Sequence, residues 1–187
     1  MPFQRPRKFY DEQMLYEYAI GSLGRRMRTV AELKRLMRNK VREQPQAELL
    51  VEVVIARLKE QKYLNDTSYA ESYSRYRQEN DKFGRRRVVQ DLKSKGVHAE
   101  IIDKTVGAAY GDVNEEQLAR EYLKRKRLTK PADQRQAAKV FRNLVRAGFD
   151  TRTIFRILKQ WDIDDETLSA LETESTEIQT EATREPS

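Results

Sequence analysis

The chain has 187 residues, of which 38% are hydrophobic and 36% charged, with a formal net charge of +7 and no cysteine. The low apolar share favours small helical units with thin cores over one large globule. The absence of cysteine excludes disulfides and thiolate chemistry and fits a reducing compartment. The N-terminus lacks the apolar core of a signal peptide, and the most apolar run, LLVEVVIA, is too short to span a bilayer. We therefore expect a soluble, cytoplasmic protein.

Charge is unevenly distributed along the chain. Residues 162–187 contain nine acidic residues against one arginine, a net of −8, so the preceding 161 residues carry +15. A basic body with an acidic tail indicates a surface that faces a polyanion. We expect the tail to screen this body against nonspecific nucleic acid.

Apolar periodicity and capping signals predict an all-α chain. The expected helices cover residues 11–23, 29–41, 47–62, 66–79, 85–95, 99–110, 114–130, 133–147 and 150–161. Capping boxes begin two of them, at Thr29 with Glu32 and at Asn114 with Gln117. Gly96 is placed where a helix C-terminus is expected. We expect residues 1–10 and the chain beyond Asp162 to be disordered.

One segment recurs along the chain. Seven residues match residues 52 positions later: Val88, Val89, Leu92, Gly96, Val97, Ile102 and Val106 match Val140, Phe141, Leu144, Gly148, Phe149, Ile154 and Leu158. A weaker copy lies 56 residues upstream, with Lys40 at the glycine position. Amphipathic helices of similar length could align by chance, but the matching glycines favour a true repeat. We predict helical repeats at 11–63, 64–111 and 112–161, between the basic N-terminus 1–10 and the acidic tail 162–187.

No catalytic constellation is visible in the sequence. The single histidine and the absence of cysteine cannot build the usual zinc sites, and no phosphate-binding loop or dinucleotide fingerprint occurs. Acidic pairs such as Glu115 and Glu116 are explained by helix starts. We expect a binding protein, not an enzyme, with no metal and no cofactor.

Basic residues recur on one face of several predicted helices. Arg135, Lys139, Arg142 and Arg146 follow helical spacing opposite an apolar face, and Arg35, Arg38 and Arg42 do the same near the N-terminus. The middle segment departs from this pattern, with Arg86, Arg87 and Lys93. One such stripe is usually a solvated face, but recurrence on a body of charge +15 favours contact with a phosphate backbone or an acidic protein groove.

The aromatic residues of the chain allow a structural or a binding interpretation. Tyr69, Tyr73 and Tyr76 share a helix face and could stack nucleobases, although a role in the core is favoured. Trp161 is interpreted as a lid on the last repeat.

The central segment is similar to the signature of the RecX family of regulatory proteins. The resemblance rests on YLNDTSYAESYSRYR followed by FGRRRVVQDLKSKGV, and includes Leu64, Asp66, Gly84, Arg86, Arg87, Leu92 and Gly96. The flanking segments RRMRTVAELKRLM and VFRNLVRAGFDTRTIFRIL look like the family's first and third repeats. The resemblance covers about residues 11–161, and the tail has no counterpart.

This resemblance implies three tandem three-helix repeats that form an elongated curved arm. Family members bind the groove of the RecA filament on DNA and modulate ATP hydrolysis and strand exchange in DNA repair and recombination. The implied partners are RecA and single- or double-stranded DNA without sequence preference, contacted by a monomer. We assign the contact to Arg25, Arg26, Arg28, Arg35, Arg86, Arg87, Lys93, Arg142 and Arg146.

Two other functions remain open. One is a general nucleic-acid-binding helical-repeat protein that acts without RecA, for which a steep salt dependence of DNA binding is expected. The other is a helical-repeat scaffold for a different partner, which would bind neither DNA nor the recombinase.

Overall fold

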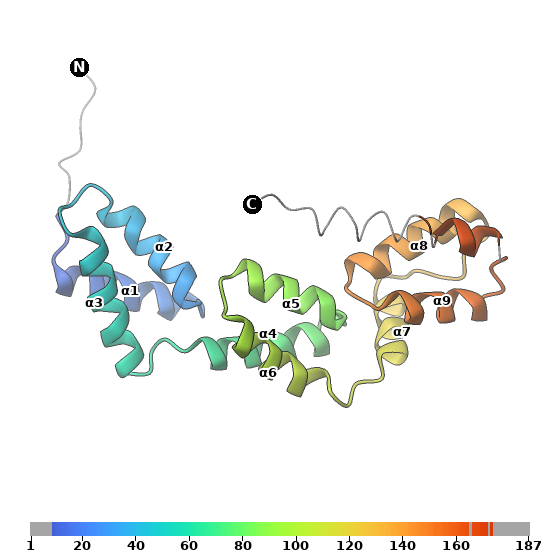
Figure 1. The fold of residues 1–187 in the computed structure, drawn as a ribbon, viewed down its shortest axis with the longest axis horizontal. Coiled ribbons are helices and arrows are strands. Elements are labelled where there is room, and N and C mark those ends of the chain that lie inside the picture. The colour runs from blue at the N-terminus through green and yellow to red at the C-terminus, as the bar shows by residue number, and fades with distance from the viewer. Residues whose placement is uncertain (1–8, 165, 172, 174–187) are drawn as a thin grey trace, which may run out of the picture. The chain divides into compact units, whose positions relative to one another are not determined.

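The computed structural model describes residues 9–164, 166–171 and 173, and within these residues every regular element is a helix (Figure 1). The helices are α1 (Glu12–Arg25), α2 (Val30–Val41), α3 (Ala47–Glu60), α4 (Asp66–Glu79), α5 (Arg85–Ser94), α6 (Ala99–Tyr110), α7 (Glu115–Arg125), α8 (Gln134–Arg146) and α9 (Thr151–Gln160). The all-α prediction is confirmed. The predicted boundaries agree within a few residues, except that α7 ends at Arg125 instead of near Lys130.

The described chain divides into two compact units. The first contains the chain up to residue 73 together with residues 92–105, and the second contains residues 74–91 together with the chain from residue 106 onward. These limits do not follow the proposed repeats at 11–63, 64–111 and 112–161, which stay a prediction. Each unit is therefore described by itself.

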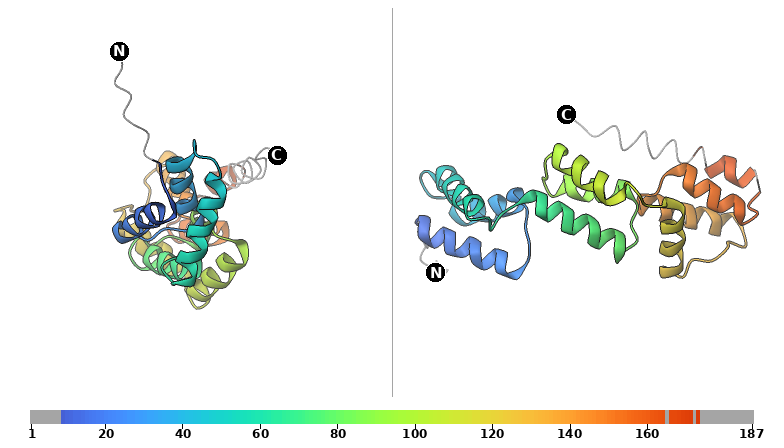
Figure 2. Two further views of the ribbon diagram at one scale, coloured as in Figure 1. Left: turned by 90° about the vertical axis from the view of Figure 1, so that its left-hand side faces the viewer. Right: turned by 90° about the horizontal axis from the view of Figure 1, so that it is seen from below.

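The core of the first unit lies among α1, α2 and α3, which pack together as one group of helices (Figure 2). Their fully buried apolar residues include Leu15, Leu33, Met37, Val51, Val54 and Leu58. Burying one such side chain stabilises the fold by about 1.5–3 kcal/mol. The predicted capping box begins α2, since the Thr29 hydroxyl accepts from the Glu32 amide at 3.1 Å and Glu32 accepts from the Thr29 amide at 3.4 Å.

The predicted disorder of residues 1–10 is wrong for Tyr10, which is ordered. Its ring packs against the first unit's core and meets the Tyr18 ring edge-on at 6.5 Å. Its amide donates to Gln44 Oε1 and its carbonyl accepts from Gln44 Nε2, both at 2.8 Å. The prediction for residues 1–8 lies outside the described residues.

The core of the second unit lies among α7, α8 and α9. Phe141, Leu144, Ile154 and Ile157 are fully buried there, and the Tyr122 and Phe149 rings meet edge-on at 5.8 Å. Trp161 packs on this core while remaining partly exposed, which confirms its interpretation as a lid.

The acidic tail begins with structure that the sequence did not predict. Residues 166–171 are helical, and Leu168 and Leu171 are buried in the second unit's core. Asp164 caps this segment by accepting from the Thr167 amide at 2.7 Å. The expected onset of disorder at Asp162 is therefore too early, because two leucines among acidic residues suffice to dock a short helix. The prediction for residues 174–187 lies outside the described residues.

The repeated glycines close the ends of α5 and α8. Gly96 and Gly148 have φ angles of +75° and +88°, and the amide after each donates to a carbonyl four residues before that glycine, at 3.2 Å. Lys62 and Arg127 end α3 and α7 at similar positive angles, so the turn alone does not require glycine. Close packing against neighbouring segments does require glycine. A Cβ at Gly96 would overlap the Ala31 side chain, and one at Gly148 would lie 2.8 Å from Arg87 Cα.

Candidate polyanion-binding surface

The nine predicted contact residues fall in both units. Arg25, Arg26, Arg28, Arg35 and Lys93 belong to the first unit, and Arg86, Arg87, Arg142 and Arg146 belong to the second. All are exposed except Arg28 and Arg142, which are intermediate.

In the first unit the structure brings Arg35 and Lys93 together. Both line an open groove of about 420 Å³ between α2 and the turn that ends α5. The groove is also lined by Ala31, Glu32, Arg38, Asn39, Ser94, Lys95 and Gly96. The contact of Ala31 with Gly96 holds these two segments together, because the missing side chain lets the start of α2 rest on the α5 turn.

Internal ion pairs decide which cations of this groove are available. Lys95 Nζ lies 3.1 Å from Glu32 Oε1, and Arg38 makes two contacts with the Glu48 carboxylate, with Nε donating to Oε2 at 2.9 Å. Burial tends to lower the pKa of Lys95, but the hydrogen bond and charge of Glu32 together with the interactions with Tyr69 outweigh it and raise that pKa. Arg35 and Lys93 have no ion pair within the described chain. These two side chains are therefore the ones left to meet an external anion.

The remaining first-unit arginines lie at the connection from α1 to α2. Arg25 is the last residue of α1, where a cation stabilises the helix C-terminus. Arg28 is half-buried, and its Nε is buried with no hydrogen-bond partner in the described ranges of the chain. The structure does not place these arginines in the lining of the α2 groove.

In the second unit, Arg86 and Arg87 have internal partners. Arg86 Nη2 lies 2.6 Å from Asp150 Oδ2, and Arg87 Nε lies 3.0 Å from Asp91 Oδ1. The Arg87 guanidinium also lies 5.9 Å from the centre of the Phe83 ring. Both residues stay about half exposed, at 57% and 43% of their side chains. They begin α5 on the Gly148 turn, so a structural role accounts for much of their presence.

Arg142 and Arg146 extend along α8. Arg146 is exposed in the last turn, whereas Arg142 and Arg135 line a hollow shared with Thr167 and Leu171. The start of the tail thus lies beside the predicted basic stripe. Sequence reasoning missed this neighbourhood because it expected no structure there.

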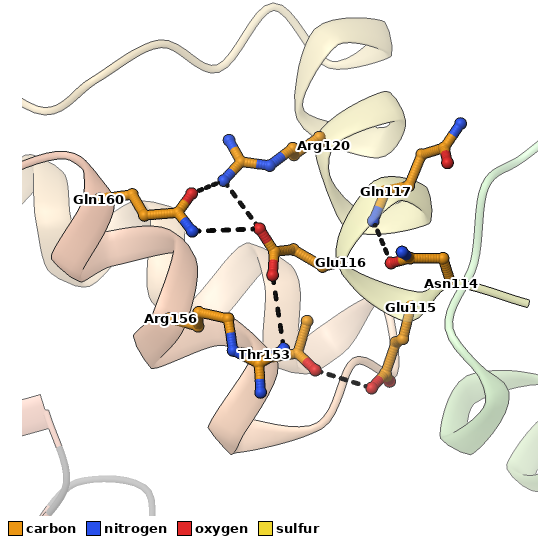
Figure 3. A network of polar contacts seen from close by, with 8 residues as sticks. All are labelled: Asn114, Glu115, Glu116, Gln117, Arg120, Thr153, Arg156 and Gln160. Carbon is orange, nitrogen blue, oxygen red and sulfur yellow. Dashed lines mark hydrogen bonds and ion pairs between the residues drawn. The ribbon is translucent and has the colours of Figure 1, made fainter.

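Polar side chains link α7 with α9 in the second unit (Figure 3). Glu115 accepts from the Asp150 amide and from Thr153 Oγ1, each at 2.9 Å. Glu116 accepts from Arg120 at 3.0 Å, from Gln160 at 3.3 Å and from Arg156 at 3.4 Å (Figure 3). These glutamates do more than stabilise a helix start, since they fix α9 against α7.

The three tyrosines of α4 have different environments. Tyr69 is buried at 8% exposure and Tyr73 is intermediate, whereas Tyr76 is 58% exposed. The Tyr69 and Tyr73 rings stack at 5.9 Å, and Lys95 Nζ lies 5.5 Å from the centre of the Tyr73 ring. The interpretation as core holds for Tyr69 but not for Tyr76.

A second hollow of the first unit was not predicted. It measures about 480 Å³ and lies where the N-terminal segment meets the connection from α2 to α3. Its lining residues are Phe9, Tyr10, Asn39, Lys40, Arg42, Glu43, Gln44 and Pro45. The pairing of Tyr10 with Gln44 brings these segments together, and no local sequence signal reports such a contact.

The described chain contains no group of three or more His, Cys, Asp or Glu side chains that could hold a metal ion. Within those residues, no helix combines the length and the apolar character needed to cross a membrane.

Comparison with known proteins identifies the family. The chain is 34% identical over 163 residues to regulatory protein RecX of Deinococcus radiodurans, a match that covers 83% of this chain and 74% of that protein. The chain belongs to the RecX family of regulatory proteins. The family's profile described as "RecX, second three-helix domain" matches residues 65–106.

Other RecX proteins agree with this assignment. The relative from Myxococcus xanthus is 31% identical over 159 residues, which covers 78% of this chain and 84% of that protein. The match to RecX of Oceanobacillus iheyensis, at 28% identity, covers 81% of this chain but spans only about half of that protein (55%).

Solved RecX structures share the fold. A crystal structure of regulatory protein RecX superposes with a TM-score of 0.64 at 24% identity, covering 80% of this chain and 71% of that one. RecX from Lactobacillus salivarius gives 0.61 at 22% identity, covering 81% and 96%.

Proposed function

We propose that this protein is a non-enzymatic regulator of a RecA-type recombinase, which it binds on DNA and inhibits in ATP hydrolysis and strand exchange. Membership of the RecX family carries the proposal, through the 34% identity to a protein named as a regulator. The recombinase and its DNA are the partners, bound by a monomer in the cytoplasm. The role belongs to DNA repair and recombination.

The exposed cations support a polyanionic partner. The chain before residue 162 has a net charge of +15. Within the described chain, Arg35, Lys93 and Arg146 are exposed and have no ion pair. A filament of recombinase on DNA offers both phosphates and acidic protein groups, and unpaired cations bind either.

Inhibition of ATP turnover tests the proposal. Preformed recombinase filaments on single-stranded DNA would be titrated with the wild-type protein and with Arg146→Glu. We expect the variant to need an about five- to tenfold higher concentration, because reversal replaces an attraction of at most about 1 kcal/mol with a repulsion. Arg86 and Arg87 are poorer probes, since reversal there would also oppose Asp150 and disturb the Gly148 turn.

Lys104→Glu is the matched control, because Lys104 is exposed on α6 and is not a predicted contact residue. Equal inhibition by the Arg146→Glu and Lys104→Glu proteins would remove Arg146 from the contact. If the wild-type protein does not change ATP turnover by the filaments, the proposed function is contradicted. Steeply salt-dependent DNA binding in that case would favour the general nucleic-acid binder.

A further inference from the structure

Two hollows of the first unit adjoin each other. Asn39 lines both the groove that contains Arg35 and Lys93 and the hollow that contains Phe9 and Tyr10. The groove is lined by Arg35 and Lys93, which have no ion pair within the part of the chain that the structure describes, and the hollow is lined by the rings of Phe9 and Tyr10. A ligand that spans both would need an anionic group next to a flat apolar one.

The hollow that contains Phe9 and Tyr10 has one exposed aromatic ring and one that is held in place. Phe9 is 68% exposed, and its neighbour Tyr10 is held by two hydrogen bonds to Gln44. The volume of about 480 Å³ lies within the range of small-molecule sites, roughly 300–1,000 Å³. An exposed ring beside cations suits the face of a nucleobase, because every base offers a π surface for stacking.

The basic groove is the half of the site that takes the anionic group of the ligand. Arg35 and Asn39 are four residues apart on α2, and Arg42, its C-cap residue, follows at i+7 with helical backbone angles, so the three share one face. Arg42 is 75% exposed, with its Nη2 3.6 Å from Glu43 Oε1, and among the described residues Arg35 and Lys93 have no ion pair. The helix dipole accounts for cations in the last turn of α2 but not for Arg35, which lies in its middle.

We infer that the two hollows form one site for an unpaired nucleotide of single-stranded nucleic acid. Arg35 and Lys93 bind the backbone phosphate, and the base lies against Phe9 with its edge toward the Asn39 amide. Duplex bases are stacked inside the helix and cannot enter such a hollow, so the site distinguishes single strands from duplex. This inference rests on the proposed function only in taking nucleic acid as the ligand.

Fluorescence anisotropy with three probes of equal length tests the site: oligothymidylate, its abasic analogue and a duplex. We expect Phe9→Ala to weaken binding of oligothymidylate by about five- to a hundredfold while leaving the abasic and duplex probes unchanged. Arg35→Ala and Lys93→Ala should weaken all three probes. Each should also lower the salt slope for oligothymidylate by about 0.7, the loss expected for one phosphate contact on a single strand.

Matched controls separate the site from general effects. Tyr63→Ala removes an aromatic ring that is 60% exposed, and Lys104→Ala removes an exposed lysine outside both hollows. Equal losses by Phe9→Ala on the thymidylate and abasic probes would overturn the assignment of the base. Losses by Arg35→Ala and Lys93→Ala no larger than that of Lys104→Ala would overturn the assignment of the phosphate.

The recombinase assay keeps the two proposals distinguishable. If Arg35→Ala weakens filament inhibition but not binding of free oligothymidylate, the groove takes an acidic protein group and the nucleotide site is wrong. If oligothymidylate binding follows the pattern above while recombinase turnover is unaffected by the wild-type protein, the nucleotide site stands and the proposed function fails.

Discussion

At the residue scale, close contacts with neighbouring segments require glycine more than a positive φ angle does. Gly84 has no positive φ, yet a Cβ there would lie 2.7 Å from the Phe149 amide nitrogen. Its amide donates to the Ala147 carbonyl at 2.8 Å, and the Arg86 amide donates to Gly148 at 3.2 Å. The start of α5 therefore rests directly on the backbone that follows α8.

Gly84→Ala should lower the free energy of unfolding by about 1–3 kcal/mol, because the added methyl group forces this backbone contact apart. Gly107→Ala is the matched control, since Gly107 is helical and nothing lies within 4 Å of its missing Cβ. That change should raise stability by about 0.5–1 kcal/mol. Urea unfolding measures both values, and an unchanged Gly84→Ala protein would refute the close contact.

At the element scale, α9 is fixed to α7 by carboxylates of the first turn of α7. Desolvation alone would raise the pKa of Glu116, but bonds from Gln160 and Arg156 and the charge of Arg120 outweigh it and lower that pKa. Sequence reasoning assigned Glu115 and Glu116 only to the helix dipole. Their partners lie up to 44 residues away, so local pattern could not reveal them.

The lowered pKa of Glu116 predicts a pH dependence of stability. A carboxylate with a lowered folded-state pKa stabilises the fold above its unfolded value of 4.5, and this contribution is lost as pH falls through the folded-state pKa. Glu116→Gln should be less stable at neutral pH and should lose less stability below pH 4.5 than the wild type. Urea unfolding across this pH range measures the difference.

Glu100→Gln serves as the control for this pH series, because Glu100 is exposed in the first turn of α6. Its stability should follow the wild-type curve. Parallel curves for Glu116→Gln and the wild type would show that the bonds to Glu116 drawn in Figure 3 do not contribute to this pH dependence.

At the scale of the whole molecule, the acidic tail has two parts. In the first part, Lys130 Nζ donates to Asp162 Oδ2 at 2.9 Å, and Asp164 caps the short helix at residues 166–171. Leu168 and Leu171 of this helix belong to the second unit's core. Residues 174–187 contain four glutamates and one arginine, a net of −3. Screening of nucleic acid is therefore best tested with the second part alone.

Truncation after Thr173 should leave the melting temperature unchanged and strengthen nonspecific DNA binding at low salt, because it removes a net charge of −3. The gain should disappear at high salt. Truncation after Ile163 should instead cost about 1–3 kcal/mol of stability, since two buried leucines are lost and some ordering entropy is regained. Unaltered low-salt affinity after the shorter truncation would contradict screening by residues 174–187.

The sequence by itself determined the fold class, most helix boundaries and the family, because these depend on local periodicity, capping residues and a contiguous signature around Gly84 and Gly96. It also identified the cations, since charge follows from composition. Only the tertiary structure decided which of them are available. Arg86 is paired with Asp150, 64 residues away, while Arg35 and Lys93 share a groove and have no ion pair among the described residues. Such pairings depend on chain segments that meet only on folding, so no periodic pattern records them.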